Sequence, residues 1–231
     1  MVYTGAMLTV HHLNNSRSQR ILWLLEELGL PYEVQRYERN PKTLLAPPAL
    51  RAIHPLGKSP VITDGATTVA ESGAIVEYLV DRYGAGPGGA ARLIPPPGTP
   101  ERLRYTSWLH DAEGSAMPPL LLKLIFDRVA ATPTWPISVI ARGIAGKVQS
   151  SFIGPQLKLH LDFMEAELAR EGWFAGPQFT AADIQMSFPI EAAAARAGLD
   201  GSRPQLMAYL SRIRAREAYQ RALTRGGPYA Y

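Results

Sequence analysis

The chain has 231 residues, of which 46% are hydrophobic and 19% charged. This length allows one large or two small domains with substantial cores, and the composition is that of an ordinary soluble protein. We expect a cytoplasmic location. The formal net charge of +4 is too slight to indicate a nucleic-acid partner, although it would attract anionic ligands. No apolar run approaches the ~20 residues of a membrane span, and no secretory leader is visible. The sequence has no cysteine, so any thiol chemistry must use a thiol of the ligand.

The first part of the chain predicts alternating strands and helices. Apolar alternation predicts a strand over residues 7–11, after a patternless extension over 1–6. The polar run at 14–16 predicts a turn, and Ser16 with Gln19 predicts a capping box that begins the first helix. The next elements are a strand over 31–37, a short helix over 49–53, a hairpin of strands over 60–63 and 67–69, and a helix from Glu71. This order, βαβαββα, is that of an α/β thioredoxin-like fold.

The second part of the chain predicts an all-α domain. A glycine- and proline-rich linker over 85–99 separates the domain over 7–84 from one over 100–231. Thr180 and Asp183 predict a capping box with a structural role only. Helical stripes are predicted at Leu103, Trp108 and Leu109, at Leu157, Leu161, Met164 and Leu168, and at Leu206, Tyr209, Leu210 and Ile213. A solvated helix face is predicted for Arg212, Arg214, Arg216, Arg221 and Arg225.

The most informative stretch runs from His54 to Ser72. Pro60 follows Ser59 at the start of a strand, where it cannot donate to the ladder, and an X-Pro bond is the kind that adopts the cis form readily. A cis bond here would leave the backbone N–H and C=O of Ser59 free to pair with an extended peptide. The helix from Glu71 would offer unpaired N–H groups and the positive end of its dipole to an anion.

Side chains around this turn complete a set of charges. Glu71 would hold a cation, Ser72 would donate a further hydrogen bond, and Lys58 would hold a second anion. A ligand with one ammonium and two carboxylates on a short extended peptide fits these groups, and glutathione has those parts. The runs His-Pro-Leu-Gly-Lys-Ser-Pro at 54–60 and Ala-Glu-Ser-Gly at 70–73 resemble the glutathione site of cytosolic-type glutathione transferases.

The resemblance extends from Leu8 to about Tyr219 and is closest to the fungal and bacterial subgroup of the family. It implies a transferase that uses glutathione as co-substrate without a metal, commonly as a homodimer. It also implies that a residue at the end of the first strand holds the glutathione sulfur. Ser16 is the first choice, and Asn15 is the alternative, because counting back without gaps from Pro31 places the family serine there.

The sulfur-holding residue has a definite energetic task. A thiol pKa of ~8.5 falls by ~2 units only if the thiolate is preferentially stabilised by about 2.7 kcal/mol. One hydrogen bond to a charged group contributes about 1.5–3 kcal/mol, and a helix N-terminus adds to it. Either Ser16 or Asn15 can donate such a bond; the structural alternatives are a plain N-cap for Ser16 and a turn residue for Asn15.

The resemblance also implies an electrophile cleft between the domains, with candidate walls at Tyr105, Trp108, Ser115 and Met117 and with core packing as the alternative for Trp108. Core or loop positions are predicted for His11, His12, His54, His110 and His160. Two other functions stay open at this point. One is glutathione-dependent reduction of disulfides or peroxides, and the other is a non-catalytic glutathione-binding or interaction module.

Overall fold

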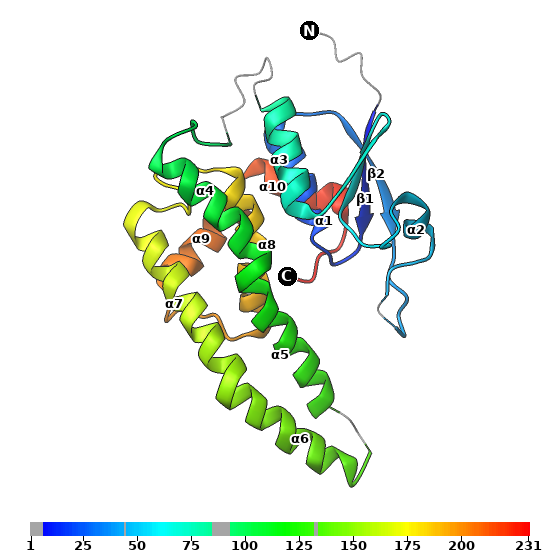
Figure 1. Ribbon diagram of the computed structural model, residues 1–231, viewed down its shortest axis with the longest axis vertical. Helices are drawn as coiled ribbons and strands as arrows, with labels where there is room; N and C mark the ends of the chain where they lie inside the picture. Colours follow the sequence, from blue (N-terminus) through cyan, green and yellow to red (C-terminus); the bar gives the residue numbers. More distant parts are fainter. Residues whose placement is uncertain (1–6, 44, 85–92, 132–133) are drawn as a thin grey trace.

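The computed structural model describes residues 7–43, 45–84, 93–131 and 134–231 (Figure 1). The predicted extension over 1–6 and residues 85–92 of the predicted linker lie outside the described residues. The domain boundaries drawn through that linker therefore stay a prediction. Within the described ranges, no helix combines the length and the apolar character needed to cross a membrane.

The N-terminal part is built around a four-stranded mixed sheet. Its elements are β1 (Leu8–Leu13), α1 (Ser18–Leu28), β2 (Tyr32–Tyr37), α2 (Ala49–Ile53), β3 (Val61–Asp64), β4 (Thr67–Ala70) and α3 (Ser72–Tyr83). The strands lie in the order β2-β1-β3-β4, with β1 parallel to β2 and the other pairs antiparallel. This confirms the predicted βαβαββα order. The first strand extends to Leu13 rather than to residue 11, because it pairs with β2 as far as Tyr37.

The C-terminal part is helical, as predicted. Its elements are α4 (Pro100–Asp111), η1 (Ala112–Ala116), α5 (Met117–Ala130), α6 (Ile137–Val148), η2 (Gln149–Ile153), α7 (Gly154–Glu171), α8 (Ala181–Arg196), α9 (Pro204–Arg214) and α10 (Glu217–Gly226). The short elements η1 and η2 are π-helical turns that join neighbouring α-helices. In Figure 1, α5 and α6 project away from the sheet as a long hairpin, whereas α10 returns to pack on α1.

Helix α8 lies in the centre of the helical part and is buried along most of its length. The predicted capping box at its start is present: the carboxylate of Asp183 accepts the backbone N–H groups of Thr180, at 2.8 Å, and of Phe174, at 2.9 Å. The predicted stripes on α7 and α9 are buried. On α4 the prediction that Leu103 belongs to the buried stripe is wrong, since that side chain is 71% exposed. The buried face of α4 instead consists of Tyr105, Trp108 and Leu109.

Among the arginines near the end of the chain, Arg214 and Arg221 are exposed as predicted, but several of the set also form ion pairs that their spacing does not predict. Arg216 pairs with Glu27 of α1, and Arg221 and Arg225 both pair with Glu26. The guanidinium of Arg225 also lies 3.7 Å from the ring centroid of Tyr32. These contacts join α10 to α1 and β2, so the arginines link the end of the helical part to the sheet domain.

Candidate functional site

The turn before β3 has the geometry predicted for it. The Ser59–Pro60 peptide bond is cis. The hydroxyl of Ser59 donates to the carbonyl of His11 at 2.9 Å and accepts the backbone N–H of Leu13 at 3.3 Å, which fixes the turn to β1. Among the described residues, the backbone N–H and C=O of Ser59 have no hydrogen-bond partner. Both groups are therefore available to an extended peptide.

The start of α3 lies beside this turn. Glu71, the residue before the helix, has a φ of 70°, in the left-handed region that residues other than glycine rarely adopt. Such backbone strain concentrates at ligand sites. No side chain among the described residues caps the helix that begins at Ser72, so its first N–H groups remain available to an anion.

These two features open on one cavity of about 260 Å³, here called the Pro60 cavity. It is lined by Arg17, His54, Leu56, Lys58, Ser59, Pro60, Ala70, Glu71, Ser72 and Glu113. The five residues predicted to bind glutathione, Lys58 to Pro60, Glu71 and Ser72, thus lie on one surface. Sequence reasoning missed His54, whose buried Nδ1 has no partner among the described residues, because an isolated histidine carries no ligand-spacing signal.

The hydroxyl of Ser72 is held by two donors. Its oxygen accepts an N–H of Arg20 at 2.6 Å and an N–H of Gln185 at 3.2 Å. Because a hydroxyl oxygen has two lone pairs, these bonds occupy its acceptor capacity and leave the O–H proton for another acceptor. Ser72 lines the Pro60 cavity, so this arrangement suits it to donate to a bound carboxylate.

Arg20 is a buried charge that links both parts of the molecule. Its side chain is 1% exposed and pairs with Glu113 of η1, while its other N–H group donates to the carbonyl of Gln185 at 2.5 Å. Arg17 reaches the same carboxylate, with Nε 2.8 Å from both oxygens. Burial alone would raise the pKa of Glu113, but Arg20 and Arg17 outweigh burial and hold that pKa below its usual range. Sequence reasoning missed this cluster because its members are distant in the chain.

The turn after β1 carries the two candidate sulfur donors. The predicted capping box of Ser16 and Gln19 is wrong: α1 begins at Ser18 without a side-chain cap, and the oxygen of Ser16 accepts the N–H of Ser18 instead. Asn15 has a φ of 49°, and its Oδ1 accepts the backbone N–H of Ala230 at 2.9 Å. The amide NH₂ of Asn15 has no partner among the described residues.

A chain of hydrogen bonds leads from Ser16 into the interior. Its hydroxyl lies 2.7 Å from that of Ser18, which lies 2.9 Å from Nδ1 of His12. Burial, followed by the charge of Arg36, lowers the pKa of His12 to about 4, so the imidazole is neutral at pH 7. The backbone of Gly226 accepts a hydrogen bond from His12, which leaves Nδ1 as an acceptor for Ser18. The hydroxyl of Ser16 therefore donates a hydrogen bond to the hydroxyl of Ser18. A stronger acceptor at the site can take this hydrogen bond in place of Ser18.

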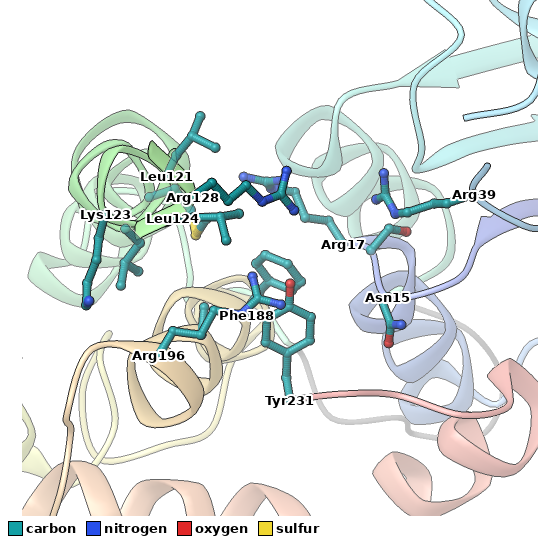
Figure 2. A pocket seen from close by; sticks show the side chains of 14 residues that line it. Asn15, Arg17, Arg39, Leu121, Lys123, Leu124, Arg128, Phe188, Arg196 and Tyr231 are labelled. Atoms are coloured by element: carbon teal, nitrogen blue, oxygen red, sulfur yellow. The ribbon is translucent and has the colours of Figure 1, made fainter. Parts of the chain in front are cut away.

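Asn15 and Ser16 line a second cavity, of about 400 Å³, here called the α5–α8 cavity (Figure 2). Of the predicted electrophile-site residues, Met117 lies on it. Ser115 is half-buried in η1 and lines neither cavity. Tyr105 and Trp108 are likewise absent from both linings, because they pack in the core. Phe188 and Tyr231 form parts of the wall that sequence reasoning missed.

The ring contacts of Trp108 explain its position. Its ring centroid lies 5.2 Å from that of Phe163 and 4.6 Å from that of Phe174. The side chain therefore joins α4 to α7 and the following loop. The alternative of core packing applies to Trp108, and its helical spacing alone could not separate the two possibilities.

Arg17 lines both cavities. The Pro60 cavity and the α5–α8 cavity therefore adjoin each other at this side chain. Over the described residues, no group of three or more His, Asp and Glu side chains is placed to hold a metal ion. The arrangement thus offers a peptide site and, next to it, a larger cavity with potential thiolate donors at its edge.

Comparisons with known proteins agree with this geometry. The family model described as "Glutathione S-transferase, N-terminal domain" matches residues 16–82, and that described as "Glutathione S-transferase, C-terminal domain" matches residues 154–217. Glutathione S-transferase 3 of Schizosaccharomyces pombe is 41% identical over 188 residues, which cover 81% of this chain and 74% of that protein. Glutathione S-transferase 1 of Saccharomyces cerevisiae is 32% identical over 222 residues, which cover 92% of this chain and 92% of that protein.

A solved structure supports the same assignment. The crystal structure of a glutathione S-transferase from Actinobacillus pleuropneumoniae superposes with a TM-score of 0.77 at 30% identity. The superposition covers 97% of this chain and 94% of that one. Both domain models, two relatives above 30% identity and the shared fold lead to one conclusion: the chain belongs to the glutathione S-transferase family.

Proposed function

We propose that this protein activates the thiol of glutathione and transfers the sulfur to a hydrophobic electrophile. The observation that carries the proposal is the Pro60 cavity, where the unpaired backbone of Ser59 lies beside the uncapped start of α3. The adjoining α5–α8 cavity, with Ser16 and Asn15 at its edge, supplies room for the second reactant.

Each part of glutathione has a partner in this proposal. Glu71 binds the ammonium of the γ-glutamyl group. The carboxylate of the same γ-glutamyl group accepts hydrogen bonds from the O–H of Ser72 and from the first N–H groups of α3. The backbone of the cysteinyl residue pairs with the N–H and C=O of Ser59. Lys58, which is exposed and lines the cavity, takes the glycyl carboxylate. The cysteinyl thiol then points past Arg17 toward Ser16.

The chemical step needs a thiolate and a positioned electrophile. Ser16 donates its O–H to the sulfur in place of Ser18, and the NH₂ group of Asn15 is the second candidate donor. The thiol proton leaves to solvent. The sulfur forms a bond to an electrophilic carbon, and the leaving group departs with its bonding electron pair. Holding both reactants side by side supplies much of the rate enhancement.

The decisive measurement is the pKa of the thiol of bound glutathione, followed by ultraviolet thiolate absorbance. We expect it to lie well below ~8.5 in the wild-type protein and to rise in Ser16→Ala. Asn15→Ala tests the alternative donor in the same way, and Ser211→Ala, at an exposed position on α9, is the matched control. An unchanged thiol pKa in Ser16→Ala would remove Ser16 from this role.

A panel of second substrates separates the proposed transferase from the two alternatives. Conjugation of aryl halides supports the proposal, whereas turnover of disulfides or peroxides alone would favour the reductase. Tight binding of glutathione with no turnover of any of them would favour the binding module. No observation on the described residues favours either alternative.

Assembly as a homodimer and a cytoplasmic location are further parts of the proposal. Apolar side chains on α5 and α6 support self-association, because they are exposed at a helical spacing: Leu121, Ile125 and Val129 on α5, and Ile140 and Ile144 on α6. Light scattering after size exclusion tests the dimer, and Ile140→Glu should shift it toward the monomer. A monomeric wild-type protein would contradict this part alone.

A further inference from the structure

The α5–α8 cavity has an apolar wall and a basic wall. Its volume of about 400 Å³ is that of an ordinary small-molecule site. The apolar wall consists of Met117, Leu120, Leu121, Leu124 and Phe188. The basic wall consists of Arg17, Arg39, Lys123, Arg128 and Arg196. Figure 2 shows Arg128 and Arg196 reaching into the space beside Phe188 and Tyr231.

The charged side chains of this lining are all basic. No Asp or Glu is among the described residues that line the cavity. Among the basic groups, Arg17 pairs with Glu113 at 2.8 Å, and Lys123 pairs with Asp127 at 2.9 Å. Arg128 and Arg196 form no ion pair with any residue that the structure describes. The guanidinium of Arg196 lies 4.6 Å from the ring centroid of Tyr231, a contact that leaves its N–H groups without a carboxylate among the described residues. Arg128 and Arg196 therefore place positive charge next to an apolar surface.

Glutathione does not account for this charge. In the proposed binding mode its two carboxylates lie at the start of α3 and at Lys58, both on the Pro60 cavity. Of the residues that the structure describes, Arg17 is the one that lines both cavities. Arg128 and Arg196 come from α5 and α8, on the side where the second reactant would lie (Figure 2). Their charges are thus directed at the second reactant.

We propose, building on the transferase function above, that the second substrate is an amphipathic organic anion. It combines an apolar electrophilic body with a carboxylate or sulfonate. The apolar wall takes the body, and Arg128 and Arg196 take the anionic group, since a guanidinium matches a planar carboxylate with two parallel hydrogen bonds. A positively charged cavity with apolar walls also concentrates anions and speeds their entry.

A matched pair of aryl chlorides tests the charge preference. The probes are 4-chloro-3-nitrobenzoate and its neutral analogue 4-chloro-3-nitrobenzamide. In both, the glutathione sulfur bonds to the ring carbon that carries chlorine, the C–Cl bond breaks, and chloride leaves with the electron pair. The thiol proton is released to solvent. The two rings differ in intrinsic reactivity, so the readout is the change in the benzoate-to-benzamide ratio of kcat/KM between variants.

The variants are Arg128→Gln, Arg196→Gln and their combination. We expect each single change to lower the ratio about three- to tenfold, mainly through KM of the benzoate, and the double change to lower it further. Arg142→Gln is the control, because Arg142 is exposed on α6 and lines neither cavity. The wild-type ratio should also fall as salt is added, and less so in the double variant.

A second readout does not depend on turnover. Binding of 3-nitrobenzoate and 3-nitrobenzamide is measured calorimetrically with S-methylglutathione present. An unchanged kcat/KM ratio in the double variant, with both chlorides conjugated, overturns the anion preference and leaves the transferase function intact. Failure to conjugate any aryl chloride overturns the transferase function, and the binding pair then decides the charge preference independently. Equal affinity of the wild-type protein for 3-nitrobenzoate and 3-nitrobenzamide overturns the anion preference.

Discussion

Nε of Arg17 lies 2.8 Å from both carboxylate oxygens of Glu113, a residue 96 positions further along the chain. The same carboxylate pairs with the buried Arg20, which donates to Ser72. A single acid in η1 therefore holds the turn after β1 and, through Arg20, the start of α3. The two parts of the molecule meet at the site through this cluster.

Replacing Glu113 with Gln should strongly destabilise the fold. The change leaves Arg20 as a buried charge without a counter-ion, and breaking a buried ion pair in this way costs about 3–5 kcal/mol. Glu217→Gln is the matched control, because Glu217 pairs with Arg221 while its side chain is 94% exposed. The free energy of unfolding in urea should change by about 0.5 kcal/mol or less in the control. Equal losses in the two variants would contradict the role of Glu113.

Glu71→Gln should weaken glutathione binding without a comparable loss of stability. The substitution removes the negative charge proposed to hold the γ-glutamyl ammonium, a contact worth about 1.5–3 kcal/mol, so the Kd should rise about ten- to a hundredfold. Glu77→Gln, an exposed position on the same helix, is the control. Calorimetric titration gives both values. A Kd for Glu71→Gln equal to that of the control would remove Glu71 from the binding site.

Local patterns predicted the elements of the site well. The Ser59–Pro60 turn, the hairpin that follows and the start of α3 depend on neighbouring residues, and all three form where they were expected. The Thr180 capping box is local in the same sense. Such features follow from the backbone preferences of a few neighbouring residues, and these preferences can be inferred from the residue types alone.

Features that depend on distant partners were not predictable. Leu103 fits a helical stripe as well as Leu109 does, but only packing against other helices decides which face of α4 is buried. The hydroxyl of Ser18 contacts His12 on β1, and no local motif encodes that contact. The ion pairs of the terminal arginines with Glu26 and Glu27 require α10 to return to α1. A single sequence contains none of these distances.

His12 should make the folded state sensitive to acid. Its pKa of about 4 lies below the ordinary value of 6.5, so between these pH values the unfolded chain binds more protons than the folded one. The free energy of unfolding therefore rises with pH from about 4 to about 6.5, and acidification through this window loses about 3 kcal/mol. His12→Asn should flatten this part of the pH profile. His110→Asn, at an exposed position, should leave it unchanged.

Nuclear magnetic resonance checks the same group directly. The ring resonances of His12 should stay in the neutral form down to about pH 5 and should identify Nδ1 as the unprotonated nitrogen. An imidazole of His12 that titrates near 6.5 would contradict the burial argument. A proton found on Nδ1 at pH 7 would reverse the direction of the hydrogen bond between Ser18 and His12, and with it the orientation of the Ser16 hydroxyl.

The capping box at the start of α8 should affect stability much more than chemistry. Helix α8 supplies Gln185, which donates to Ser72, but neither Thr180 nor Asp183 lines the Pro60 cavity or the α5–α8 cavity. Thr180→Ala should cost about 1 kcal/mol, because it removes the side-chain part of the cap. Asp183→Ala should cost more, since it leaves the buried N–H groups of Thr180 and Phe174 without an acceptor.

Thr180→Ser is the matched control for this pair, because it keeps the hydroxyl. Urea unfolding gives the stabilities, and conjugation of 1-chloro-2,4-dinitrobenzene at a temperature well below the unfolding transition gives kcat and KM. We expect these constants to stay within about twofold of wild type in Thr180→Ala, because a lost cap lowers the folded population rather than altering the folded site. A tenfold fall in kcat with full folding retained would instead mean that the cap positions α8 for the reaction, and the structural role assigned to Thr180 would be wrong.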